Sequence, residues 1–78
     1  MKKVDKVWAY LSIENDVEGV CAFFSKATGG WMPMVATTKK TMEMMGDVAQ
    51  DLADTSGAQI KLAEFTVRTD IKIIEPEQ

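Results

Sequence analysis

Few residues of this chain could carry out chemistry. Its 78 residues include no histidine, one cysteine (Cys21) and one arginine (Arg68). Without histidine there is no imidazole to act as a general base or to bind zinc, and a lone thiol cannot form a disulfide within the chain. Cys21 also lacks a neighbouring base in the sequence that would activate it. The sequence therefore predicts no catalytic residue, no metal site and no cofactor.

The charged side chains indicate what the protein could bind. Twelve acidic and nine basic residues give a net charge of −3 and a pI near 4.8. This balance disfavours nucleic acid, whose binding relies on basic side chains that neutralise phosphates. Arg68 could anchor a small anionic ligand. Four acidic residues recur at helical spacing, as a docking face for a basic protein or as a solvated face: Glu43, Asp47, Asp51 and Asp54.

Apolar alternation and turn residues predict a single α+β domain over residues 1–78. Period-two alternation indicates strands at about residues 6–14, 19–25, 31–36 and 59–67. A wide apolar arc, with Thr37 or Thr38 as N-cap and Gly57 as C-cap, predicts a helix over residues 38–55. Residues 69–74 form either a short helical turn or a strand, and residues 75–78 form a polar tail. The order β-β-β-α-β is a two-layer fold, in which one amphipathic helix covers one face of a three- to four-stranded sheet.

The expected strands carry apolar side chains on both faces, whereas one helix can cover only one of them. We expect the helix to cover the face that contains Val7, Ala9, Leu11 and Ile13. The opposite face would then expose an aromatic set, which consists of Trp8, Tyr10, Phe23 and Trp31. An exposed apolar patch of this size is uncommon on monomers and favours a homodimer interface. Alternatively, residues 69–74 fold back over this face.

These patterns favour a non-catalytic interaction module that self-associates and binds a partner protein. The alternative is a small-ligand-binding protein, whose pocket would be lined by aromatic side chains and by some of the six methionines, with Arg68 as the ligand anchor. The apolar runs, such as Val20–Phe24, are too short to span a bilayer or to form the core of a signal peptide. A cytoplasmic protein without a membrane contact is therefore expected.

The order of the elements resembles that of the HicB-like antitoxin domain. The residues that carry this resemblance are Val7–Ile13, Val20–Phe24, and the stretch from Gly30 through Thr37 and Thr38 to Leu52. The resemblance implies a dimeric module that neutralises a small basic RNase toxin. This sequence differs from that family in having no appended ribbon-helix-helix or helix-turn-helix segment, so the resemblance does not extend to DNA binding. The pattern fits small phage and mobile-cassette proteins equally well, and these imply no particular function.

Overall fold

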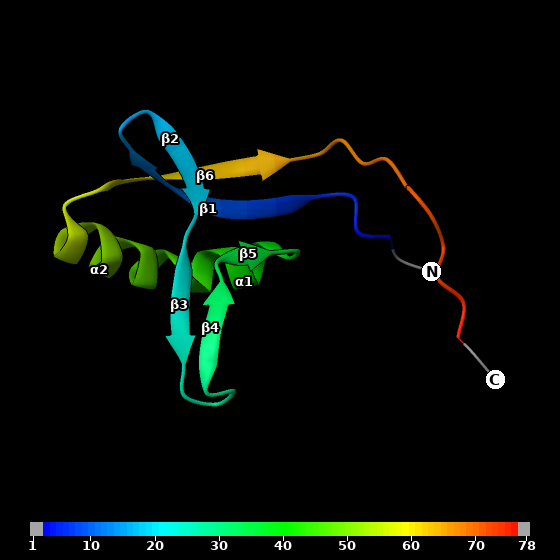
Figure 1. Ribbon diagram of the computed structural model, residues 1–78, viewed down its shortest axis with the longest axis horizontal. Helices are drawn as coiled ribbons and strands as arrows, with labels where there is room; N and C mark the ends of the chain where they lie inside the picture. Colours follow the sequence, from blue (N-terminus) through cyan, green and yellow to red (C-terminus); the bar gives the residue numbers. More distant parts are fainter. Residues whose placement is uncertain (1–2, 77–78) are drawn as a thin grey trace.

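The structure is a computed structural model that describes residues 3–76. It has the α+β architecture that the sequence predicts, with two antiparallel sheets and a bent helix of 18 residues. The elements follow in the order β1 (Val7–Glu14), β2 (Val17–Val20), β3 (Ala22–Ser25), β4 (Gly30–Pro33), β5 (Val35–Ala36), α1 (Lys39–Met44), α2 (Gly46–Ser56) and β6 (Gln59–Phe65). In Figure 1 the helix lies beneath the sheet that contains β1 and β6, and the β3–β4 hairpin projects downward from this sheet.

The hairpin between β1 and β2 closes more tightly than the sequence predicts. Instead of a loop over residues 15–19, a two-residue turn at Asn15 and Asp16 connects the strands, and both residues have positive φ, 50° and 64°. Asn and Asp tolerate this left-handed region better than other non-glycine residues. The second strand consequently begins at Val17, two residues earlier than expected.

A junction of three backbone segments organises the whole sheet. The Cys21 amide donates to the Tyr10 carbonyl (2.9 Å), the Met34 amide donates to the Cys21 carbonyl (2.8 Å), and the Tyr10 amide donates to the Met34 carbonyl (3.1 Å). On one side of Tyr10, β1 pairs with β2; on the other side, it pairs with β5. The predicted strands 19–25 and 31–36 are therefore each divided at this junction, and their far halves pair with each other as β3 and β4.

The predicted helix over residues 38–55 is present, but it bends at Met45. The Thr38 hydroxyl caps its start by accepting from the Thr41 amide at 3.2 Å, and Gly57 ends it in the left-handed conformation at φ 73°. At the bend, the Tyr10 hydroxyl donates to the Met42 carbonyl at 2.7 Å. A side chain that inserts into the helix hydrogen-bond ladder is a known cause of bends, so Tyr10 both supports the helix and explains its shape.

The helix covers the face of the sheet opposite to the one that the sequence suggested. The core cluster consists of Tyr10, Cys21, Met34 and Ala49 of α2, with Ile60 of β6 packed against it. The expectation that the helix covers Val7, Ala9, Leu11 and Ile13 is therefore wrong. These odd-numbered side chains of β1 point away from the helix, because successive side chains of a strand alternate between faces. Tyr10 decides the choice, since its ring packs in the core while its hydroxyl bonds to the helix backbone.

After β6 the chain leaves the sheet. Residues 66–76 form neither helix nor strand, so the predicted helical turn or strand at 69–74 is absent, and they do not fold back over the sheet (Figure 1). The last two residues of the predicted polar tail, 77–78, lie outside the described residues. The radius of gyration of 15.0 Å exceeds the about 11–12 Å expected of a compact domain of this length. The extended terminal segments account for the difference.

Candidate interaction surface

The side of the sheet that the helix leaves uncovered carries several exposed apolar side chains, with the Lys61–Glu18 ion pair crossing it above β1, and we call it the open face. It consists of the odd-numbered side chains of β1 and the residues that share their face through cross-strand pairing. Its exposed large members are Val20, Phe24, Trp31, Val35 and Phe65. Residues that pair across antiparallel strands lie on the same face of the sheet. Because side chains alternate along each strand, the neighbours of Cys21 and Met34, and every second residue of the β3–β4 hairpin beyond them, belong to the open face. The open face therefore extends from β6 to the tip of the hairpin.

An aromatic pair forms the most exposed part of the open face. Phe24 of β3 lies opposite Trp31 of β4, and their rings meet edge to face with centroids 5.8 Å apart and an interplanar angle of 76°. Trp31 is nevertheless 71% exposed and Phe24 54% exposed. The pair is thus pre-oriented by its own contact, yet it still presents most of its apolar area to solvent.

The structure separates the four aromatic residues that the sequence grouped into one interface. Tyr10 is buried in the core, where burial raises its pKa. Phe23 also packs against the core, and Trp8 is half-buried, with the Lys6 ammonium 5.8 Å from the centre of its ring. Among these four only Trp31 lies on the open face. Phe24 lies on the open face in place of Phe23.

Alternation along the sequence is too weak a signal to identify the other members of the open face. Val20, Ala22 and Phe24 are all even-numbered, so alternation places them on one face of their predicted strand. It does not say whether that face is the one the helix covers. Both faces of β1 are apolar, so alternation alone defines two sets of residues without saying which set the helix covers. The feature that distinguishes the two faces of β1 is the Tyr10 hydroxyl, because a buried hydroxyl group needs a hydrogen-bond partner.

The acidic residues of the helix are exposed, as their spacing predicts. Glu43 lies in α1, and Asp47, Asp51 and Asp54 lie in α2. Asp54 accepts a hydrogen bond from the Gln50 side chain at 2.9 Å. Within residues 3–76, none of the three ion pairs of the structure involves these four carboxylates. They form an unneutralised acidic surface on the side of the molecule away from the open face.

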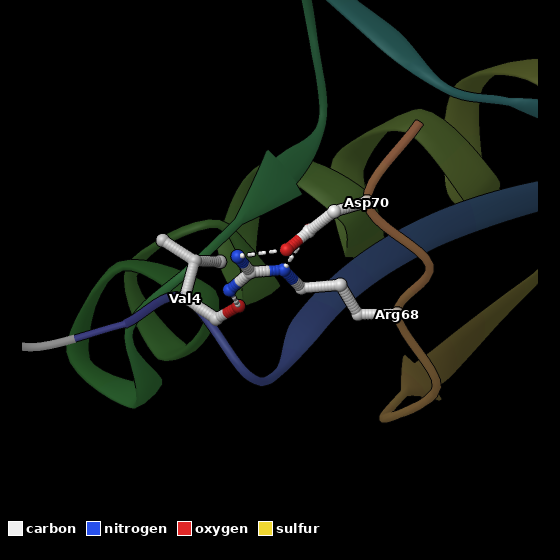
Figure 2. Close-up of polar contacts among 3 residues, drawn as sticks. All are labelled: Val4, Arg68 and Asp70. Atoms are coloured by element: carbon white, nitrogen blue, oxygen red, sulfur yellow. Dashed lines mark hydrogen bonds and ion pairs between the residues drawn. The ribbon is translucent and has the colours of Figure 1, made fainter. Parts of the chain in front are cut away.

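Arg68 binds groups of its own chain. Its guanidinium donates to both carboxylate oxygens of Asp70, at 2.6 and 3.0 Å, and to the Val4 carbonyl at 3.1 Å, as Figure 2 shows. These hydrogen bonds and the attraction of the opposite charges raise the pKa of Arg68 and lower the pKa of Asp70. The contact connects the N-terminal segment to the segment after β6. An anionic ligand would have to displace Asp70 to reach this arginine.

The methionines and Cys21 mostly belong to the core. Met34 is fully buried, and Met42 and Met45 pack against the core cluster. Cys21 is buried as well, and this burial raises the pKa of its thiol, opposed in part by a hydrogen bond with Ser12. A hollow of about 600 Å³ does exist between the two terminal segments, but its walls are formed by residues such as Lys3, Val4, Phe65 and Arg68 and include no methionine.

The described residues also bear on two other kinds of function, metal binding and membrane insertion. Among residues 3–76, no group of three or more His, Cys, Asp or Glu side chains is arranged to hold a metal ion. In the same part of the chain, no helix has the length and apolar character needed to cross a membrane.

Comparison of the chain with protein-family models, with curated proteins and with solved structures finds no match.

Proposed function

We propose that this protein is a non-catalytic interaction module whose open face binds a second copy of the chain. The observation that carries the proposal is the set of large apolar side chains exposed together on one face of the sheet: Val20, Phe24, Trp31, Val35 and Phe65. Fully burying a large apolar side chain contributes about 1.5–3 kcal/mol, and these residues, which are 37–71% exposed, would contribute the corresponding fraction of that value. Two such sheets packed face to face would lie about 10 Å apart, with the side chains interdigitated.

The small core supports the same conclusion. Among residues 3–76, the buried apolar residues number seven, and three of these are alanines: Ala9, Tyr10, Leu11, Cys21, Met34, Ala36 and Ala49. A domain of this length with so few large buried side chains has a marginal hydrophobic contribution to its stability. Association through the open face would enlarge that core, so folding and self-association would reinforce each other.

The test is the oligomeric state of matched variants. The double substitution Phe24→Ser and Trp31→Ser should remove the open-face contact, so that the variant sediments as an assembly of half the wild-type size in sedimentation velocity at tens of micromolar. Val48→Ser is the control, because Val48 is also an exposed apolar residue but lies on α2. A wild-type protein that sediments as a monomer, or a control that dissociates as readily as the double variant, would refute the assignment of the open face.

A partner protein of basic character is the natural complement of the acidic helix surface. Such a partner is also what the resemblance to HicB-like antitoxins implies. The attraction of exposed carboxylates would accelerate association and weaken with added salt. Charge reversal at Asp47 and Asp51, compared with charge reversal at Asp16 in the β1–β2 turn, measures this contribution in binding titrations against a small basic protein at low and high salt. If the two reversals weaken binding equally, the helix surface is not the docking site.

A further inference from the structure

The segment after β6 is built like a strand but has no partner in its own chain. Val67, Ile71, Ile73 and Ile74 are all β-branched, the side-chain type that is enriched in strands. They are 81–92% exposed, the highest exposures among the large apolar residues of residues 3–76. Isolated exposed apolar residues are ordinary, but four within eight residues of extended chain indicate a segment that is covered in the assembled protein.

The strand from which this segment continues, β6, has a free edge. Among the described residues, β6 pairs only with β1, so its other edge keeps unpaired backbone groups. Such an edge is a template for another strand. A small hollow of about 190 Å³ also lies between α2 and β6, with Gly46, Ala49 and Leu62 in its walls, and Leu62 is 45% exposed. Both the edge and the hollow would accept an extended apolar segment.

We propose that two copies of the chain exchange these segments, so that residues 69–75 of each copy pair antiparallel with the free edge of β6 in the other. The segment continues directly from β6, and antiparallel pairing about a two-fold axis near Arg68 therefore places each segment on the partner's β6. With Ile73 opposite Ala63, residues 71–75 lie opposite residues 61–65 of β6, and residues 69–70 lie opposite residues 66–67. At roughly 3.4 Å per residue, the seven-residue segment spans about 24 Å.

Charge complementarity selects the register of this pairing. Setting Ile73 opposite Ala63 also brings two pairs of opposite charges together across the strands, Lys72 with Glu64 and Glu75 with Lys61. The same register places Arg68 opposite its own copy, where each guanidinium is paired with Asp70 of its own chain. A shift by two residues in one direction places Asp70 opposite Glu64, a repulsive pair. A shift by two in the other direction places Ile74 opposite Glu64. In the single chain, Lys61 and Glu64 form exposed ion pairs with Glu18 and Lys6, which lie on the β1 side of β6, so both side chains would turn toward the partner segment in the exchanged dimer.

Apolar contacts favour the same register. Ile71 falls opposite Phe65 on the open face, and Ile74 falls opposite Leu62 on the helix side, next to the small hollow. Because the two-fold axis is perpendicular to the sheet, the open faces of the two copies lie on the same side and form one larger apolar face. This contact is independent of face-to-face binding. The two contacts together would give a closed tetramer with dihedral symmetry, a common assembly of identical chains.

Cysteine cross-linking of two singly substituted full-length chains tests the exchange. A mixture of the Ala63→Cys and Ile73→Cys variants should form a disulfide-linked heterodimer on mild oxidation, because directly opposed residues of antiparallel strands have Cβ atoms close enough for a disulfide. Neither variant alone should cross-link, since residue 63 is not opposite residue 63, and the native Cys21 is buried. Ile73 is exposed, so its replacement leaves the fold of the chain intact.

Two controls test the register of the pairing and distinguish segment exchange from the open-face contact. A mixture of Ala63→Cys with Lys72→Cys places the second thiol one residue away on the other face, and cross-linking should fall at least about 10-fold. Equal cross-linking in both mixtures, or none in either, overturns the proposal. Repeating the first mixture in the Phe24→Ser/Trp31→Ser background separates this contact from the open-face contact. A cross-link that persists there supports segment exchange even if the open face does not bind a second copy.

Discussion

At the residue scale, the protein depends on a few side chains that each satisfy more than one requirement. Tyr10 fills the core with its ring and bends the helix with its hydroxyl, while its backbone takes part in the three-segment junction. Cys21 and Met34 have the same double role, since their amides and carbonyls complete the junction and their side chains form the core above it. Substitutions at these positions therefore affect packing and strand connectivity together.

Met34 offers the clearest test at this scale, because its side chain is fully buried. Met34→Ala should lower the free energy of unfolding by about 2–5 kcal/mol, the usual cost of a large-to-small change in a core. Met34→Leu, which nearly conserves volume, should cost less than about 1.5 kcal/mol. Met44→Ala is the matched control, as Met44 is 68% exposed. Urea unfolding curves measure all three, and a similar loss for Met34→Ala and Met44→Ala would contradict the assigned core.

At the scale of elements, the helix is well specified at its ends and interrupted at its middle. Thr38 and Gly57 fix its limits through local chemistry, a side-chain cap and a left-handed residue. The bend at Met45 has a non-local cause, the hydrogen bond from Tyr10 on β1. Gly46 follows the bend, and a methyl group built there would lie 3.7 Å from the Tyr10 hydroxyl, an ordinary contact distance.

Two glycine substitutions should therefore have opposite effects. Gly46→Ala should raise the free energy of unfolding by about 0.5–1 kcal/mol, because alanine restricts the unfolded chain and favours helix while the added methyl group fits. Gly57→Ala should lower it by about 1–2 kcal/mol, because position 57 has a φ of 73°. Thermal and urea unfolding report both changes. Destabilisation by Gly46→Ala would show that the bend requires glycine for a reason other than space.

At the scale of the whole molecule, the sheet is covered on one side only, and the two terminal segments are connected at one end. The contact of Arg68 with Asp70 and the Val4 carbonyl (Figure 2) joins them at the end of the sheet where β1 begins and β6 ends. Both side chains of this ion pair are largely in solvent, so its contribution to overall stability is small. Its effect is to set the direction in which the apolar segment leaves the molecule.

The protonation of Asp70 provides the corresponding prediction. Arg68 lowers the pKa of Asp70 in the folded protein below the ordinary value of 3.8. The contact is therefore fully formed above the ordinary pKa and is lost as the pH falls through the lowered one. In carboxyl-detected NMR titrations, Asp70 should titrate below its ordinary range in the wild type and return toward 3.8 in Arg68→Gln. An unchanged Asp70 titration in that variant would show that the ion pair does not form in solution.

The sequence by itself determined the α+β class and the ends of the helix, because period-two alternation, a threonine cap and a left-handed glycine act through local chemistry. It also placed Trp31 among the exposed aromatic residues. It could not decide which face of the sheet the helix covers, because both faces of β1 are apolar and exchanging them leaves the alternation unchanged. Only the tertiary structure decides this, through the Tyr10–Met42 hydrogen bond and the junction of Tyr10, Cys21 and Met34, which join residues far apart in the chain. The same long-range contacts divide the two predicted strands and leave Phe24, Trp31 and Phe65 on the side without a helix.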